Sequence, residues 1–311
     1  MRAFIFPGQG SQTVGMGQAL SAASAVAREV FQEVDEALGQ HLSRLMAEGP
    51  AEELMLTENA QPAIMANAIA TLRVLEREGG IRLADKAEFV AGHSLGEYTA
   101  LCAAGALGLA ETARLLRIRG QAMQAAVPVG EGAMAALLGL DFEAARQIAA
   151  DAAEGEVCEA ANDNAPGQVV VSGSKAAVER AVELAKVRGG KRAMLLPVSA
   201  PFHCSLMEPA ARAMEKALAG ADLRAPLVPV YANVTAAPVA DAATIRTLLV
   251  EQVTGTVRWR ESVEAMAAAG VAEFIEFGGK VLGPMVKRIA PDATPTSIVT
   301  MDDIEALSKA L

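Results

Sequence analysis

Along the chain, short apolar runs typical of buried strands alternate with stretches whose apolar residues recur every three or four positions, as in helices. The apolar runs predict strands at residues 3–6, 87–90, 133–140, 157–161, 168–172, 193–198, 228–231, 273–277 and 297–300. The helical spacing predicts helices at residues 24–38, 50–56, 61–78, 95–105, 109–126, 141–153, 174–187, 204–218, 243–253, 259–269, 282–289 and 302–311. Because strands that alternate with helices form parallel sheets with both faces covered, we expect an α/β fold with a mostly parallel sheet flanked by helices.

The middle of the chain departs from this alternation. Residues 133–198 are predicted to run strand, helix, strand, strand, helix, strand, which is the order of a ferredoxin-like (βαββαβ) unit. We therefore expect residues 129–198 to form an inserted subdomain, and residues 1–128 and 199–311 to form the larger domain. No low-complexity linker bounds the insertion, so the join between the two domains should be rigid.

One pentapeptide, Gly92-His93-Ser94-Leu95-Gly96, lies between a predicted strand and a predicted helix. This Gly-x-Ser-x-Gly context is that of a nucleophile elbow, a turn so sharp that the residues beside the serine must be small. The elbow exposes the serine hydroxyl above a helix N-terminus, where free backbone N–H groups can stabilise an oxyanion. The pentapeptide alone is also compatible with a tight turn that has no chemical role.

A serine nucleophile needs a base, and the chain has three histidines. An elbow turns His93 away from its neighbour Ser94, and His41 lies in a polar stretch that we expect at the surface. His203 remains as the candidate base, because it follows an extended Ala-Pro segment and opens a predicted helix, whose dipole favours the neutral imidazole. No carboxylate is an evident third member, so either a distant acid or a neutral carbonyl orients the ring.

Arg119 interrupts an otherwise apolar helical stripe. Positions 115, 118, 119 and 122 share one face of the predicted helix, and the other three are Leu, Ile and Ala. A buried guanidinium requires an anion, because an unpaired buried charge is costly. The anion is either a structural carboxylate of the chain or a substrate carboxylate held by a bidentate clamp, and a long side chain could also extend to solvent.

Composition restricts the classes of function. The 311 residues are 52% hydrophobic and carry a formal charge of −10, which argues against a nucleic-acid partner. The three cysteines have no metal-binding spacing and fit the reducing cytoplasm. Neither a signal peptide nor an apolar run of membrane-spanning length is present. The glycine-rich segment 7–17 lacks the spacing of a dinucleotide fingerprint or a P-loop.

Six segments in order make the chain resemble the malonyl-CoA:acyl carrier protein transacylase family. They span nearly the whole sequence and are residues 6–12 (FPGQGSQ), 92–98 (GHSLGEY), Arg119-Gly120, Asn162 with 166–168 (PGQ), 198–203 (VSAPFH) and 251–253 (EQV). The resemblance implies a hydrolase-like α/β domain interrupted by a ferredoxin-like subdomain, with the active site between them. It also implies transfer of a malonyl group from malonyl-CoA to the phosphopantetheine thiol of acyl carrier protein, without a metal or cofactor.

The resemblance implies a role for each candidate residue. The catalytic pair would be Ser94 and His203, and Arg119 would bind the malonyl carboxylate. The backbone N–H groups of Gln9 and Leu95 would form the oxyanion hole. The backbone carbonyl of Gln252 would orient His203, and Asn162 and Phe202 would line the site. We further expect the Phe202 side chain to narrow the pocket against branched acyl groups such as methylmalonyl.

Two rival functions fit part of this pattern. A serine esterase or thioesterase would use Ser94 and His203, but it would not explain Arg119. A catalytically silent scaffold that binds acyl carrier protein would not need Ser94, His203 and Arg119 intact.

For docking of the acidic carrier protein we expect at least one of two basic groups to flank the site, residues 188, 191 and 192 or residues 280, 287 and 288. The chain length and the final helix favour a free-standing protein.

Overall fold

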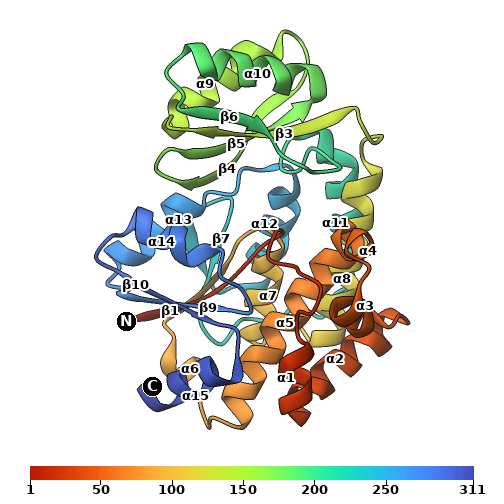
Figure 1. The fold of residues 1–311 in the computed structure, drawn as a ribbon, viewed down its shortest axis with the longest axis vertical. Helices are drawn as coiled ribbons and strands as arrows, with labels where there is room; N and C mark the ends of the chain where they lie inside the picture. The colour runs from red at the N-terminus through yellow and green to blue at the C-terminus, as the bar shows by residue number, and fades with distance from the viewer.

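A computed structural model describes all residues, 1–311, and shows two separate sheets (Figure 1). The larger sheet has six strands in the order β10-β9-β1-β2-β7-β8, all parallel except β8, which pairs antiparallel to β7. Its strands are β1 (Arg2–Phe6), β2 (Phe89–Gly92), β7 (Val230–Ala232), β8 (Ala237–Val239), β9 (Glu273–Phe277) and β10 (Thr294–Ile298). The carboxyl ends of the parallel strands therefore lie at one edge of this sheet.

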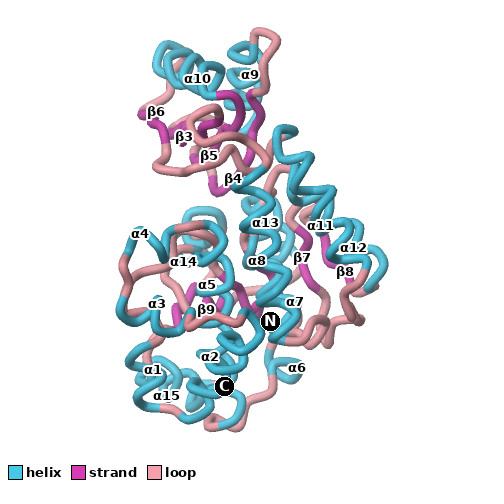
Figure 2. Tube along the Cα trace, turned by 90° about the vertical axis from the view of Figure 1, so that its right-hand side faces the viewer, coloured by secondary structure: helices cyan, strands magenta, loops and turns pink.

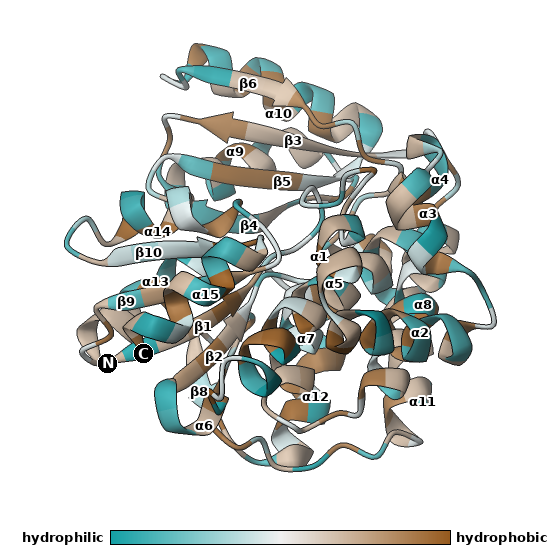
Figure 3. Ribbon diagram, turned by 60° about the horizontal axis from the view of Figure 1, so that its bottom comes forward, coloured by the Kyte–Doolittle hydropathy of each residue, from teal (hydrophilic) through white to brown (hydrophobic).

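Side chains of β1 alternate between the two faces of the larger sheet, as the two-residue period of a strand requires. Phe4 and Phe6 join the larger core cluster with the helices of one face, whereas Ala3 and Ile5 pack with Trp259 on the other face. Both faces are thus buried, which explains the continuous apolar character of β1 and β2 (Figure 3).

Helices cover both faces of the larger sheet. The helices on the side of Phe4 and Phe6, or continuous with that layer, are α1 (Gln18–Ala23), α2 (Ala25–Leu38), α3 (Leu42–Glu48), α4 (Ala51–Met55), α5 (Thr57–Arg77), α6 (Leu83–Lys86), α7 (Leu95–Ala103), α8 (Leu109–Ala125), α11 (Glu208–Ala219), α12 (Ala242–Thr254) and α15 (Met301–Ala310). The helices on the side of Ala3 and Ile5 are α13 (Trp259–Ala268) and α14 (Leu282–Ile289). No helix is both long enough and apolar enough to cross a membrane.

The smaller sheet is antiparallel, and it lies with its two helices at one end of the molecule (Figure 2). Its order is β4-β5-β3-β6, and its elements are β3 (Gly132–Leu138), α9 (Phe142–Ala153), β4 (Cys158–Ala165), β5 (Gln168–Ser174), α10 (Lys175–Val187) and β6 (Arg192–Leu195). This order is that of a ferredoxin-like unit, and the unit has a hydrophobic core of its own. The expected fold class, a parallel-rich sheet flanked by helices plus a ferredoxin-like antiparallel sheet, is confirmed.

The two sheets are tied together at β4. The backbone N–H of Val257 donates to the Ala161 carbonyl, and the N–H of Asp163 donates to the Val257 carbonyl. The Asp163 carboxylate, which is 1% exposed, also forms an ion pair of 2.8 Å with Arg260 of α13. These contacts support the proposal that the chain divides into a larger domain (1–128, 199–311) and an inserted subdomain (129–198) with a stiff join.

Several predicted boundaries are wrong. The segment 162–165, expected as a loop, continues β4, because it pairs with β5 through two irregularities in register. Helix α5 begins at Thr57 and contains Pro62, since close packing against Gly120 of α8 holds the turn that precedes the proline. Helix α11 begins at Glu208, after a 3-10 turn at 205–207. Elements α1, α3, α6 and β8 were not predicted, because they are short and lack a clear period.

Candidate active site

Loops at the carboxyl edge of the larger sheet surround a cavity of about 720 Å³. Gln9 follows β1, Ser94 follows β2, and Val281 follows β9, so the parallel arrangement brings three distant segments together. The smaller sheet contributes Asn162 and Val170 to the same cavity. The cavity therefore lies between the two sheets.

Ser94 occupies the strained turn that the sequence predicted. Its backbone has φ 54° and ψ −113°, and it immediately precedes the first residue of α7. A Cβ atom on Gly92 would lie 1.8 Å from the Gly96 carbonyl oxygen, and one on Gly96 would lie 2.3 Å from the Phe6 carbonyl oxygen. Both positions therefore require glycine, and the close approach holds β1, β2 and α7 together beneath the serine.

Two amides fix the elbow from other parts of the chain. The backbone N–H of Ser94 donates to Oδ1 of Asn233 (2.8 Å), and Nδ2 of Asn233 donates to the Gly92 carbonyl (2.7 Å). Nε2 of Gln252 donates to the Ser94 carbonyl (3.0 Å). Asn233, which immediately follows β7, was not among the residues expected at the site. The sequence feature that could have identified Asn233 as a site residue is its position directly after a predicted parallel strand.

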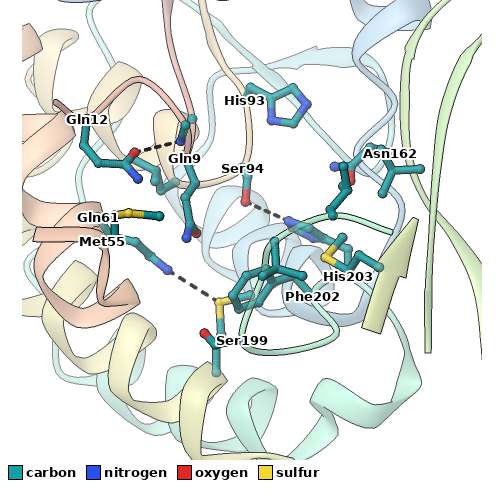
Figure 4. Close-up of a pocket in the computed structure, with 18 of the residues that line it drawn as sticks. Gln9, Gln12, Met55, Gln61, His93, Ser94, Asn162, Ser199, Phe202 and His203 are labelled. Carbon is teal, nitrogen blue, oxygen red and sulfur yellow. Dashed lines mark hydrogen bonds between the residues drawn. The ribbon is translucent and has the colours of Figure 1, made fainter. Parts of the chain in front are cut away.

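The His203 ring lies between the serine and a neutral carbonyl (Figure 4). Its Nδ1 is 2.9 Å from the Gln252 backbone carbonyl oxygen, which can only accept a hydrogen bond, so Nδ1 carries the proton. Nε2 of the neutral ring then accepts from the Ser94 hydroxyl over 2.7 Å. Of the two alternatives for orienting the ring, the structure places a carbonyl at Nδ1 rather than a carboxylate.

Burial and, to a smaller extent, the nearby Arg119 charge lower the pKa of His203 to about 3, against the opposing effect of the Gln252 carbonyl. The ring is therefore neutral at the pH of the cell, as a general base must be. Neither of the other two histidines contacts the Ser94 hydroxyl, although His93 also lines the cavity. His41 is exposed, and His93 points away from the serine hydroxyl, with its Nε2 2.7 Å from Oδ1 of Asn164.

Arg119 is 1% exposed and has no carboxylate within ion-pair distance. Its Nη1 donates to Gln61 (2.8 Å), and its Nη2 donates to Gln252 Oε1 (2.9 Å) and to Ser94 Oγ (3.1 Å). Its Nε is buried without a partner, and the guanidinium carbon lies 5.6 Å from the centre of the Tyr98 ring. The structural ion pair considered from the sequence is absent, so the guanidinium retains capacity for an external anion beside the serine hydroxyl.

The other expected site residues border the cavity. Leu95 is the first residue of α7, where backbone N–H groups have no acceptor within the helix, and Gln9 is exposed in the loop after β1. Asn162 and Phe202 also line the cavity, and Gln9 and Asn162 lie on opposite sides of Ser94 in the close-up (Figure 4). Gln61, which bonds Arg119, was not predicted, because nothing local distinguishes it within its helix.

A serine held on a strand-to-helix turn and open to a cavity, with a neutral histidine as its base, defines an enzyme that forms an acyl-serine. A family profile described as "Acyl transferase domain" matches residues 3–279. The chain is 48% identical over 289 residues (92% of this chain and 90% of the relative) to the malonyl CoA-acyl carrier protein transacylase of Bacillus subtilis. It belongs to the malonyl CoA-acyl carrier protein transacylase family.

Solved structures of this family match the whole fold. The acyl-carrier-protein S-malonyltransferase of Bartonella henselae is 54% identical, with a TM-score of 0.97 and coverage of 99% of this chain and 98% of that chain. A malonyl-transacylase in complex with a type II polyketide synthase acyl-carrier protein is 40% identical, with a TM-score of 0.96 and coverage of 100% and 99%. The arrangement of the whole fold, including both sheets, thus recurs in these proteins.

Proposed function

We propose that this protein transfers a malonyl group from malonyl-CoA to the phosphopantetheine thiol of acyl carrier protein, through a malonyl ester on Ser94. One observation supports this above the others: the Ser94 hydroxyl lies 2.7 Å from Nε2 of His203 and 3.1 Å from Nη2 of Arg119. A base for the nucleophile and a cation for an acid-tailed acyl group therefore meet at one oxygen atom.

In the first half-reaction the Ser94 oxygen attacks the thioester carbonyl while its proton passes to Nε2 of His203. The backbone N–H groups of Gln9 and Leu95 stabilise the oxyanion that forms, and Arg119 binds the free carboxylate. When the carbon–sulfur bond breaks, His203 returns the proton to the departing CoA sulfur. A thioester needs less help from the base than an amide does, which fits a histidine oriented by the Gln252 carbonyl.

In the second half-reaction the carrier-protein thiol gives its proton to His203 and attacks the malonyl ester. The Ser94 oxygen recovers that proton when the ester bond breaks, so the enzyme returns to its starting state. The two half-reactions share one site, and ping-pong kinetics should result. Parallel initial-rate lines with malonyl-CoA and carrier protein as the varied substrates would support this scheme, and intersecting lines would contradict it.

Esterase or thioesterase activity is the alternative use of the same pair. It would leave the buried Arg119 charge without a function, and the relatives named above are transacylases. The proposal requires the malonyl ester to reach a thiol faster than water. Release of free malonate at the rate of thiol transfer would favour the hydrolase.

We also propose that carrier protein docks beside α14. Val281, Leu282 and Met285 line the cavity, and the exposed Lys280 and Arg288 are their near neighbours in sequence. The guanidinium of Arg288 donates to the Pro166 carbonyl (2.7 Å) at the β4–β5 turn, so its position on this side of the mouth is fixed. The other basic group is less suited, since Arg188 already pairs with Asp151.

Charge reversal tests the docking site. Lys280→Glu should raise the KM for carrier protein several-fold and leave loading from malonyl-CoA unchanged, while Arg188→Glu serves as the matched control on the other basic group. Equal effects of the two variants would contradict this site.

The three cysteines are free and buried, and this supports the proposal that the protein works in the reducing cytoplasm.

A further inference from the structure

Glu97 is a buried carboxylate that the proposed reaction does not use. It lies in the first turn of α7, three residues after the nucleophile, and its side chain is 1% exposed. Its Oε2 accepts from the Asn233 backbone N–H (3.0 Å) and from Nε2 of Gln252 (2.9 Å). Both donors are neutral, so no cation pairs with this carboxylate directly.

The Gln252 side chain bridges this carboxylate to the substrate cation. Its Nε2 donates to Glu97, while its Oε1 accepts from Nη2 of Arg119 (2.9 Å). One amide thus separates the only two charged groups of the network, and its dipole is aligned with both of them. When the acyl pocket is empty and Glu97 is ionised, the pair Arg119 and Glu97 carries no net charge.

An acid-tailed acyl group disturbs this balance. Its carboxylate binds Arg119 under the proposed function, and the site then holds two carboxylates near one guanidinium. Two like charges in a buried site are unfavourable, and one of them gains a proton if the surroundings allow it. The substrate carboxylate has direct donors on Arg119, whereas Glu97 has only neutral ones.

We propose that Glu97 neutralises Arg119 while the acyl pocket is empty and takes up one proton from water when a carboxylate-bearing acyl group occupies it. This inference rests on the proposed function of Arg119 as the carboxylate clamp. It makes Glu97 a positioning and charge-balancing residue, which acts on the substrate through Gln252 and Arg119. The proton converts the Glu97 carboxylate to a carboxylic acid, and no bond of the substrate changes in this step.

The surroundings of Glu97 favour such a change. Burial raises the pKa of Glu97 to about 7, and the hydrogen bonds from Asn233 and Gln252 and the charge of Arg119 oppose this rise only in part. The charged or titratable groups that face it are Arg119 from α8 and its own neighbour Tyr98, whose pKa is raised by burial. From β7 and α12 it meets the neutral Asn233 and Gln252, and the nearby His203 is neutral.

The test compares loading of Ser94 from malonyl-CoA with loading from acetyl-CoA, which lacks the carboxylate. Taking the ratio of the two kcat/KM values removes any pH dependence that comes from His203, Ser94 or the CoA thiol, because both acyl-CoAs share it. Between about pH 6 and about pH 8.5 this ratio should fall about 30-fold, because the protonated fraction of a carboxyl with a pKa near 7 falls by that factor. Glu97→Gln should make the ratio independent of pH, since an amide keeps an acceptor but cannot be ionised.

Glu276→Gln is the matched control. That carboxylate is equally buried, but it accepts from backbone N–H groups at the start of α14 and is not bonded to the Arg119 network. Its variant should keep the wild-type pH profile. A wild-type ratio that does not change with pH, or a Glu97→Gln ratio that still falls, would overturn the proposal.

A measurement on the wild-type protein keeps the proposal testable if Glu97→Gln does not fold. Malonyl loading near pH 8 should take up close to one proton per site, measured with a pH indicator, whereas acetyl loading should take up none. The protons released by partial ionisation of the free CoA thiol are the same for both acyl groups and are subtracted. Equal uptake with the two acyl groups would refute the role of Glu97. Failure of malonyl-CoA to acylate Ser94 at any pH would instead refute the proposed function itself.

Discussion

Replacing Arg119 by methionine separates recognition of the acyl group from its chemistry. The side chain is buried and makes no direct ion pair with a carboxylate of the chain, so its N–H groups remain available to the malonyl carboxylate. Removing one member of a buried charge pair costs about 2–5 kcal/mol. Loading from malonyl-CoA should therefore fall between about 30-fold and about 4,000-fold in kcat/KM. Acetyl-CoA has no carboxylate, so its loading should be unchanged or faster.

The assay is intact-protein mass spectrometry of rapidly quenched mixtures, with each acyl-CoA tested separately. Arg114→Met is the control, because this residue is exposed on the same helix, α8. Stability should change little, since removal of a desolvated charge offsets the hydrogen bonds lost at Gln61 and Gln252, and Glu97, whose pKa burial raises to about 7, can take up a proton when its counter-charge is removed. A melting temperature close to the wild-type value would exclude unfolding as the cause. Equal losses with malonyl-CoA and acetyl-CoA would refute the assignment of Arg119 to the carboxylate.

Two further substitutions and one pH dependence follow from the same geometry. Asn233→Ala removes the acceptor of the Ser94 N–H, at a cost of about 1–3 kcal/mol, so malonyl and acetyl loading should fall together in stopped-flow assays, and a loss confined to one would contradict this. Acetyl loading should show no inflection near pH 6.5, because the folded pKa of His203 is about 3. The raised pKa of Glu97 opposes the effect of His203 on stability, so the linkage is tested in the Glu97→Gln background, where melting temperatures should drop as pH falls from about 6.5 towards 3 because the unfolded chain binds more protons at His203. Phe202→Ala should raise methylmalonyl-CoA loading relative to malonyl-CoA, whereas equal wild-type rates with both would reject the role of Phe202.

Local signals in the sequence account for the best-predicted parts of the site. Gly92 could be interpreted because its need follows from a close backbone approach to Gly96 within the same five residues, whereas Gly96 lies against the distant Phe6 carbonyl. Arg119 could be singled out because one charge interrupts an apolar helical stripe. His203 followed from the small number of histidines. For Gly92 and Arg119 the physical cause acts over a few residues and leaves a local pattern, whereas His203 was reached by elimination over the whole chain.

Contacts between distant segments account for what was missed. Asn233 holds an elbow that is 139 residues away in sequence, and Gln61 meets Arg119 across 58 residues, so neither is marked by its own neighbours. The role of the Gln252 backbone carbonyl came only from the family resemblance. The loop predicted at 162–167 has residues with low strand propensity, yet pairing with β5 and with Val257 extends β4 through most of it.

The most direct test of the account is the mass of the intact protein after mixing with malonyl-CoA, followed by peptide mapping. The wild-type protein should gain one malonyl group on Ser94, and acyl carrier protein bearing its phosphopantetheine thiol should then remove it and become malonylated. Ser94→Ala should gain nothing. A malonyl adduct on another residue, or undiminished transfer by Ser94→Ala, would contradict the central claim that this serine carries the acyl group.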